Sequence, residues 1–245
     1  SRWSNSNLYK LTIVMTETLD TYKEGRLLLI DKPLNWTSFQ VVNKVRWLIK
    51  QQFNIKKIKV GHAGTLDPLA TGLLILCTGK FTKKIETYQA QVKEYTGTIT
   101  LGATTPSYDL ESEIDQKFDF SEISKEDILK NTQQFLGKIQ QQPPIFSALK
   151  KNGKRLYEYA REGSKIDIPS RSVTIKEFQI TKIELPYLEF RIICGKGTYI
   201  RSLAHDFGRS LNNGAHLSSL RRTKIGRFRV EDAIDVLEVE KLIKS

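Results

Sequence analysis

The sequence predicts one compact domain that mixes helices with strands. Stretches with the two-residue alternation of strands follow stretches with helical spacing along the chain. No internal repeat and no long flexible linker interrupts them. With 245 residues, of which 39% are hydrophobic and 27% charged, the chain can bury a substantial core.

The first 25 residues are expected to form a tail outside this domain. Met15 is the only methionine, and the segment from Met15 to Thr18 reads as a natural start. We therefore expect residues 1–14 to be non-native sequence or upstream translation. The first 25 residues contain no apolar core with a cleavage site, as a signal peptide would.

A strand and a helix are predicted next. Residues 26–30 are apolar and end at a proline-containing turn, as a buried strand does. Thr37 and Gln40 have the spacing of a capping box, so a helix should begin at residue 38. Helical spacing extends this helix to residue 53 through Val42, Val45, Ile49 and Phe53.

Residues 61–74, GHAGTLDPLATGLL, place one carboxylate, Asp67, in a glycine-rich loop. Pro68 disfavours a helical backbone at Asp67. The apolar run 73–77 predicts a buried strand that anchors the loop, and loops anchored in this way often carry functional groups. Asp67 in isolation would more often be a turn residue that bonds its own backbone.

Further elements follow in order. Residues 92–101 alternate as a strand, with Tyr95 on its apolar face. Ser124 should cap a helix that Leu129, Phe135 and Leu136 hold in place, with Gly137 ending it. Two alternating strands are predicted over residues 173–193. The helix that follows has an apolar stripe of Ile200, Leu203, Ala204 and Phe207. A last helix is predicted over about residues 231–243.

The segment at about 140–171 has a different character, because it is polar, contains prolines and is strongly basic. Ammonium and guanidinium groups bind phosphates, and aromatic side chains can stack on bases. We interpret this segment as an RNA-binding insertion, although a solvated helix face would have a similar composition. The candidate contacts are Lys150, Lys151, Lys154 and Arg155.

Composition restricts the partners. Lys and Arg outnumber Asp and Glu by 39 to 27, giving a net charge of +12 and indicating nucleic acid first and an anionic membrane second. No stretch reaches the length needed to span a bilayer. Cys77 and Cys194 lie in apolar runs, which suggests reduced thiols in a cytoplasmic protein. The histidines and cysteines have no zinc spacing, so we expect no metal.

The loop sequence HAGTLDPLATG resembles the motif of TruB-type bacterial tRNA pseudouridine synthases, and further segments resemble the same family in chain order. The resemblance covers about residues 26–243. It implies an α+β fold with a long mixed, mostly antiparallel central sheet flanked by helices, and a catalytic domain over residues 26–245 with a basic thumb-like insertion. The further segments are Lys93-Glu94-Tyr95, Leu101 to Asp109, Pro144 to Lys150, Gly197 to Arg201 and Gly214 to Arg222.

The resemblance also assigns roles. Asp67 corresponds to the essential catalytic carboxylate of the family. Tyr95 would stack on the flipped uracil and assist proton transfer from carbon 5, and Tyr199 would line the site. Arg201 would pair with Asp67 and keep it ionised, as a nearby opposite charge does.

Four more positions receive roles from the resemblance. Leu220 would pack against the target base, although plain core packing uses the same chemistry. His62 would enter the space that the flipped nucleotide vacates. Arg221 and Arg222 are expected to contact phosphates.

The implied reaction converts uridine to pseudouridine at position 55 in the T loop of tRNA, without guide RNA and without a cofactor. Asp67 could attack carbon 1 of the ribose, act as a base toward carbon 2 or attack the uracil ring. We expect a monomer in a short form that lacks the C-terminal PUA domain of many members. An RNA-binding module, or an assembly protein with a relic site, are the alternatives; binding without turnover would identify them.

Overall fold

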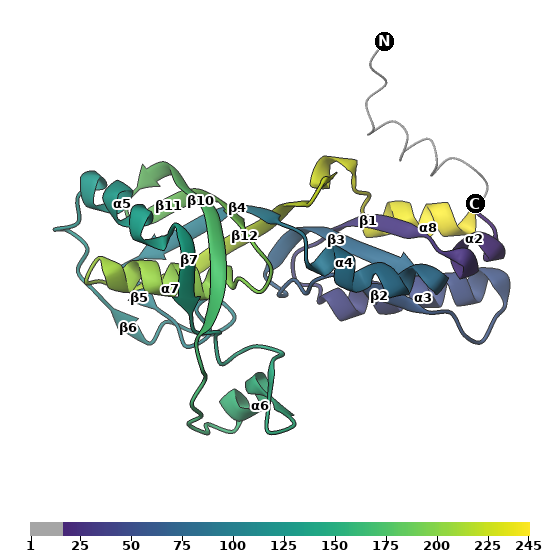
Figure 1. The fold of residues 1–245 in the computed structure, drawn as a ribbon, viewed down its shortest axis with the longest axis horizontal. Helices are drawn as coiled ribbons and strands as arrows, with labels where there is room; N and C mark the ends of the chain where they lie inside the picture. Colours follow the sequence, from purple (N-terminus) through teal and green to yellow (C-terminus); the bar gives the residue numbers. More distant parts are fainter. Residues whose placement is uncertain (1–16) are drawn as a thin grey trace, which may run out of the picture. The chain divides into compact units, whose positions relative to one another are not determined.

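The computed structural model describes residues 17–245, in which seven α-helices accompany a nine-stranded sheet (Figure 1). These residues divide into two compact units. Unit 1 comprises the chain up to Glu94 together with Arg221–Ser245, and unit 2 comprises Tyr95–Leu220. Strands β4 (Lys93–Leu101) and β12 (Ala215–Ile225) pass from one unit into the other.

Unit 1 is built around the strand order β1-β3-β12, with β2 beside β3 and β13 beside β12. The pairings of β1 and β2 with β3 are antiparallel. Its other elements are α2 (Leu19–Glu24), β1 (Leu27–Lys32), α3 (Ser38–Phe53), β2 (Val60–His62), β3 (Ala70–Thr78), η1 (Gly79–Lys84), α4 (Ile85–Gln89), β13 (Phe228–Arg229), η3 (Val230–Asp232) and α8 (Val236–Lys244).

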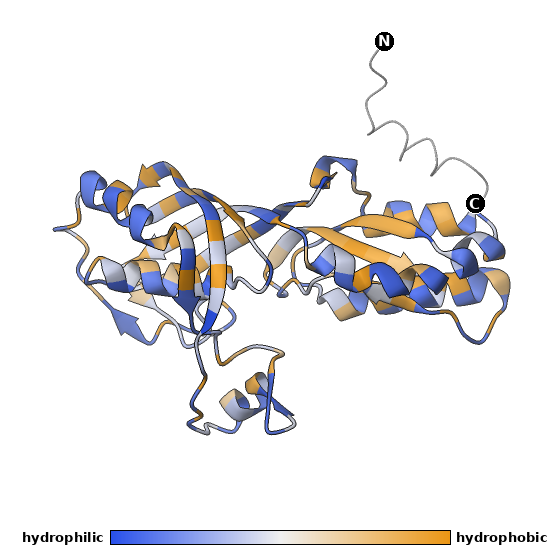
Figure 2. Ribbon diagram, viewed as in Figure 1, coloured by the Kyte–Doolittle hydropathy of each residue, from blue (hydrophilic) through white to orange (hydrophobic). Residues whose placement is uncertain are grey.

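Both faces of the unit 1 sheet are covered. Leu74 and Leu76 of β3 point to one face and pack with α3 and α8. Leu73 and Ile75 point to the other face, where Ile225 and residues of η1 and α4 meet them. Burial on both faces explains why this strand reads as an unbroken apolar run instead of an alternating one (Figure 2).

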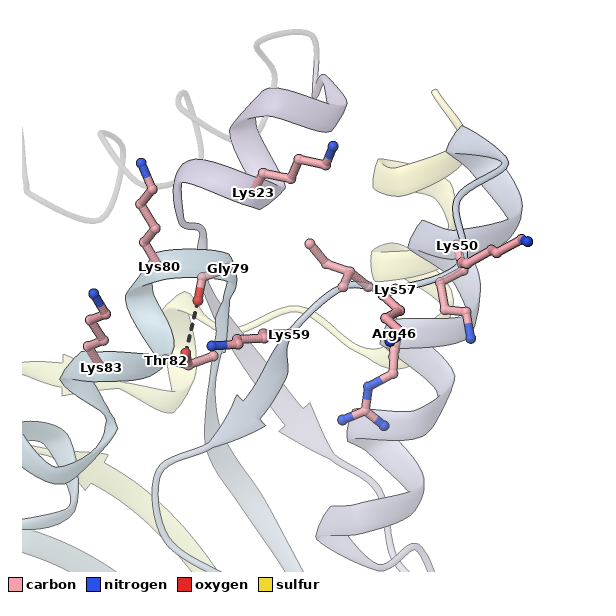
Figure 3. Close-up of a pocket in the computed structure, with 11 residues that line it drawn as sticks. Lys23, Arg46, Lys50, Lys57, Lys59, Gly79, Lys80, Thr82 and Lys83 are labelled. Atoms are coloured by element: carbon pink, nitrogen blue, oxygen red, sulfur yellow. Dashed lines mark hydrogen bonds between the residues drawn. The ribbon is translucent and has the colours of Figure 1, made fainter.

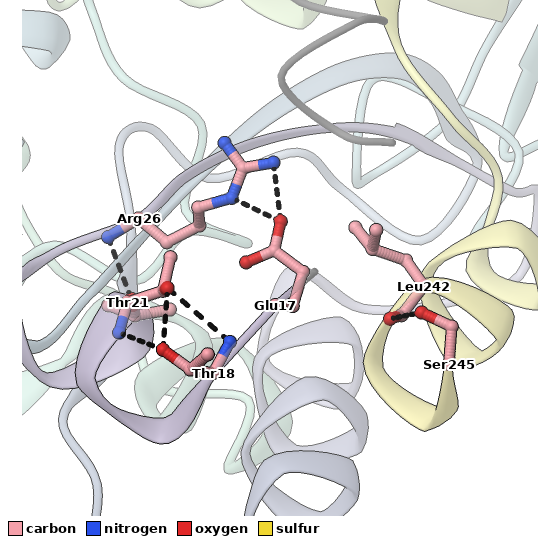
Figure 4. A network of polar contacts seen from close by, with 7 residues as sticks. Glu17, Thr18, Thr21, Arg26, Leu242 and Ser245 are labelled. Atoms are coloured by element: carbon pink, nitrogen blue, oxygen red, sulfur yellow. Dashed lines mark hydrogen bonds and ion pairs between the residues drawn. The ribbon is translucent and has the colours of Figure 1, made fainter. Parts of the chain in front are cut away.

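The first described residues are part of unit 1. The Glu17 carboxylate accepts a hydrogen bond from Arg26 Nε at 2.9 Å, and its side chain is almost fully buried (Figure 4). Thr18 and Thr21 form a capping box at the start of α2. Tyr22 in this helix is completely buried. Residues 17–25, within the predicted tail, therefore contribute to the core; residues 1–16 lie outside the described part of the chain.

Unit 2 has the strand order β12-β4-β11-β10-β7. β10 pairs antiparallel with both β7 and β11. Phe178 of β10 and Phe207 of α7 have ring centroids 5.2 Å apart, and Phe135 contacts both rings. The other elements of this unit are β5 (Ala103–Thr104), β6 (Gln116–Lys117), α5 (Lys125–Asn131), η2 (Thr132–Phe135), β7 (Gly137–Gln141), β8 (Lys150–Lys151), β9 (Lys154–Arg155), α6 (Leu156–Arg161), β10 (Arg171–Glu184), β11 (Tyr187–Cys194) and α7 (Ile200–Ser210).

The predicted insertion leaves unit 2 between β7 and β10. It contains the short hairpin of β8 and β9, followed by α6, and it projects from the rest of the unit (Figure 1). Asn152 and Gly153 both have positive φ, as a tight hairpin turn requires.

The α+β class, the large mostly antiparallel sheet and the flanking helices are confirmed. Three local predictions were wrong. Gly137 begins β7 and does not end α5, which stops at Asn131 and is followed by η2. Ile128, fully buried, holds α5 in place, whereas Leu129 is 51% exposed. The last helix starts at Val236, because Asp235 caps it and the short turn η3 precedes it.

Candidate active site

Unit 1 holds the Asp67 loop between β2 and β3. Asp67 is half-buried, and its carbonyl oxygen accepts a hydrogen bond from Ala70 N at 2.9 Å, which closes a turn around Pro68. Ser38, the first residue of α3, makes two hydrogen bonds to Leu66, the residue before Asp67. Its Oγ accepts from Leu66 N at 2.9 Å and donates to Leu66 O at 3.1 Å. The start of α3 thus sets the backbone immediately before Asp67.

Lys32, at the end of β1, is fully buried beneath the same loop. Its ammonium group donates to the carbonyl oxygens of Pro33, Trp36 and Pro68, the last at 3.4 Å. Burial lowers the pKa of Lys32 to about 8, and the Asp67 charge opposes that lowering. A buried cation therefore interacts electrostatically with the candidate catalytic carboxylate. Sequence reasoning missed Lys32, although a lysine at the end of an apolar strand was visible.

Arg222 is also buried in unit 1, with 1% of its surface exposed. Its guanidinium donates to Leu73 O at 2.8 Å and to Gly64 O at 3.0 Å. Gly72 lets strands β3 and β12 approach each other closely, because a Cβ at this position would lie 2.2 Å from the Arg222 carbonyl oxygen. Arg222 supports the loop from inside, so the expectation of a phosphate contact is wrong for this residue.

The other two expected unit 1 residues lie at the loop's edges. Burial, followed by the Arg222 charge, lowers the pKa of His62, which keeps the imidazole neutral at pH 7. Arg221 forms a two-pronged ion pair with Asp31, at 2.9 and 3.0 Å. Its guanidinium is partly exposed but engaged, and Thr71 accepts a third hydrogen bond at 3.3 Å.

Unit 2 contributes Arg201, which lies in the first turn of α7 and is 3% exposed. Its Nη1 donates to Phe146 O at 2.8 Å and to Ser107 O at 3.2 Å. These carbonyls belong to the base of the insertion and to the loop after β5. A buried guanidinium that joins three segments is a positioned cation and not a surface charge.

Tyr199 caps α7 and is held by Gln141, a buried residue that sequence reasoning missed. Tyr199 N donates to Gln141 Oε1 at 2.8 Å, and Gln141 Nε2 donates to Tyr199 O at 3.1 Å. Tyr95 is 8% exposed on β4, and Leu220 is half-buried on β12. The unit 2 residues therefore come from β4, β12 and the start of α7.

A stacked pair beside Arg201 was not expected from the sequence. The rings of Tyr108 and His205 lie 3.9 Å apart and are tilted by 15°. Burial lowers the pKa of His205 and raises that of Tyr108, so both rings are neutral at pH 7. Burial also raises the pKa of Asp206, the next residue on α7, to about 6. The only sequence signal was His205 four residues after Arg201.

The basic residues of the insertion are partly engaged. Lys154 forms an ion pair with Glu162, and Lys151 donates to the carbonyl of Asp167. Arg155 donates to Ala148 O at 2.7 Å. Lys150 is exposed, and its side chain has no hydrogen bond or ion pair within the described residues, so it is the most available cation of the four.

Within residues 17–245 no group of three or more His, Cys, Asp or Glu side chains could hold a metal ion. No helix in the same range has the length and apolar content to cross a membrane. Cys77 and Cys194 are free and buried, and burial raises the pKa of Cys77 to about 11.

Each unit thus offers one half of the expected chemistry. Unit 1 holds a carboxylate on a braced loop above a buried ammonium group. Unit 2 holds a buried guanidinium with aromatic side chains. The Asp67–Arg201 pair, which spans the two units, stays a prediction.

Comparison with known proteins gives consistent matches. Residues 50–200 match the TruB family pseudouridylate synthase N-terminal domain, and residues 201–245 match the tRNA pseudouridylate synthase B C-terminal domain. The tRNA pseudouridine synthase B of Flavobacterium johnsoniae is 60% identical over 228 residues, which cover 93% of this chain and 100% of that protein. That of Phocaeicola vulgatus is 52% identical over 215 residues, covering 88% and 92%.

Solved structures with a similar fold include chains of two multi-component complexes. A chain of a Cbf5-Nop10-Gar1 complex has a TM-score of 0.68 and 27% identity, covering 92% of this chain and 56% of that one. A chain of an H/ACA RNP bound to a substrate RNA containing 2′-deoxyuridine has a TM-score of 0.66 and 25% identity, covering 92% and 55%. This chain thus spans little more than half the length of those two. The matches over nearly its whole length show that the chain belongs to the TruB family of pseudouridylate synthases.

Proposed function

We propose that this protein is a tRNA pseudouridine synthase that isomerises uridine to pseudouridine. The observation that carries the proposal is the Asp67 loop, which combines the family motif with a carboxylate braced by Ser38 and by buried Lys32. The 60% identity to a protein named tRNA pseudouridine synthase B supports tRNA as the substrate.

The reaction breaks the bond between N1 of uracil and carbon 1 of the ribose. The base rotates, carbon 5 bonds to the same ribose carbon, and the proton leaves carbon 5 while N1 regains one. Atoms balance without an oxidant or an energy source. The target uridine must leave its stack to reach the carboxylate, and an aromatic or apolar pocket must receive it.

We assign roles by the family pattern and the local geometry. Asp67 is the catalytic carboxylate. Arg201 is the buried cation that faces it in the active state, and Tyr95 stacks on the flipped uracil. Tyr199 and Leu220 line the base pocket, and His62, kept neutral, enters the gap in the RNA. Lys32 is a positioning residue, since its partners are backbone carbonyls of the loop region.

We further propose the uridine at position 55 of the T loop as the target, without guide RNA. Residues 26–245, together with residues 17–25 that complete the core, would form the catalytic domain, and the insertion at about 140–171 would contact the RNA. We place the reaction in the cytoplasm and expect a monomer. The near-complete coverage of two relatives named tRNA pseudouridine synthase B supports tRNA as the RNA that carries this uridine.

The test uses an unmodified tRNA transcript without any guide RNA, the native chain, and the isosteric variant Asp67→Asn. Pseudouridine is scored by reverse-transcription stops after carbodiimide treatment. The native chain should give a stop at the T-loop uridine, and the variant should be slower by about a thousandfold or more. If both proteins bind the tRNA and neither makes product, the chain is an RNA-binding module and the proposal fails.

A further inference from the structure

A strongly basic cavity lies in unit 1, separate from the Asp67 loop. It has a volume of about 690 Å³, and eight of its eleven lining residues are Lys or Arg. Four segments surround it: α2, α3, residues 56–59 and η1 (Figure 3). Ile58 is the only large hydrophobic residue among the eleven lining residues.

The positive charge of this basic cavity is poorly neutralised. Lys80 pairs with Glu24 at 2.9 Å, and Arg46 donates to Val60 O and Asn43 Oδ1. The remaining six lysines form no ion pair with any carboxylate in the described chain. Like charges gathered in a hollow repel one another, and a concave wall focuses their field. Such a cluster is stabilised when a polyanion enters.

The position of the cavity is set by β3. The Asp67 loop precedes the start of β3 at Ala70, and η1 begins directly after its end at Thr78. A strand rises about 3.3 Å per residue, so η1 at the cavity lies roughly 25 Å from the start of β3, where the turn that carries Asp67 ends. A phosphate in the cavity would therefore belong to a nucleotide several positions away from the one at Asp67.

We infer that this cavity binds the phosphate backbone of the tRNA outside the arm that carries the target uridine. The inference rests on the proposed function, whose substrate it extends. The sugar-phosphate backbone of an RNA is a polyanion that can enter a cavity lined by flexible cations. Phosphate contacts of this kind position an RNA without reading its sequence. A membrane surface fits less well, because membrane-binding faces need apolar side chains beside the cations.

The test compares two triple variants with the same loss of charge. K56Q/K57Q/K59Q removes three exposed cavity lysines, and K125Q/K130Q/K241Q removes three exposed lysines elsewhere. Dissociation constants are measured by fluorescence anisotropy over a range of salt, for the full tRNA and for a hairpin of the target arm alone. Pseudouridine formation is followed on both RNAs.

The cavity variant should bind full tRNA about tenfold more weakly than the native chain, and its salt slope should fall by about three. The control variant should lose much less affinity for full tRNA, and the two variants should bind the hairpin with similar dissociation constants. The inference would be overturned if the two variants lost equal affinity for full tRNA. It would also be overturned if the cavity variant lost as much affinity for the hairpin as for full tRNA. Loss of binding to phosphatidylserine vesicles with unchanged tRNA binding would identify a membrane site instead.

The two proposals fail in distinguishable ways. If the native chain made no pseudouridine on either RNA, the proposed function would fail. The comparison of dissociation constants on full tRNA would still decide whether the cavity binds it.

Discussion

At the scale of single residues, Lys32 shows how a buried charge can support the candidate catalytic loop. It is fully buried, yet its ammonium group has three backbone carbonyl acceptors. The low pKa, about 8 against an ordinary 10.5, means that burial costs more than the Asp67 charge returns. The charged group that holds the loop therefore lowers the free energy of unfolding through its own burial.

This arrangement predicts a pH-dependent stability. Between pH 8 and 10.5 the unfolded chain keeps a proton on Lys32 that the folded chain has lost, so stability rises with pH. The free energy of unfolding of the native chain, minus that of Lys32→Met, should increase by about 2 kcal/mol from pH 7 to 9.5. Urea unfolding measures both values at each pH. Lys32→Arg, which stays charged, should give the same increase, and a flat difference would contradict the assignment.

The neighbouring arginines Arg221 and Arg222 show the limit of reading single residues. Both were expected to contact phosphates, because the family resemblance assigned that role to them. The structure gives one an ion pair with Asp31 and buries the other against the carbonyls of Gly64 and Leu73. Only the pairing of β12 with β3 decides which side chain turns inward, and that pairing is not a local property.

At the scale of elements, local signals determined how well the sequence could be read. Helix α3 was predicted to the residue, since its capping box and its apolar stripe lie within one stretch. The expectation that Leu129 holds α5 in place was wrong, because the adjacent Ile128 fits a neighbouring helix face and only tertiary packing selects which residue is buried. Lys32, Gln141 and Tyr108 were missed for the same reason, as their partners are distant in sequence or on loops.

The start of α3 offers a test of how an element positions the candidate catalytic carboxylate. Ser38→Ala removes both hydrogen bonds to Leu66, whereas Thr37→Ala removes only the helix cap. Each substitution should cost about 1–2 kcal/mol of stability. Only Ser38→Ala should slow pseudouridine formation in single turnover, since it frees the residue before Asp67. Equal rates for the two variants would show that the Ser38 contact does not position the loop.

At the scale of the whole molecule, the charge of +12 is carried in part by two separate basic surfaces. One is the basic cavity of unit 1, and the other is the insertion of unit 2, where Lys150 is the freest cation. Composition alone could indicate a polyanionic partner, but not this division. Two surfaces on one RNA would fix its position better than one patch of equal charge.

Independent surfaces predict multiplicative losses of tRNA affinity. Lys150→Glu should weaken binding of full tRNA, and Lys130→Glu, an exposed charge reversal on α5, should weaken it much less. Combining Lys150→Glu with K56Q/K57Q/K59Q should multiply the two increases in dissociation constant, because free energies from sites without shared partners add to within about 0.5 kcal/mol. A combined loss well below the product, measured by the same anisotropy titration, would mean that both surfaces contact the same phosphates. Unchanged binding for Lys150→Glu would remove the insertion from the RNA interface.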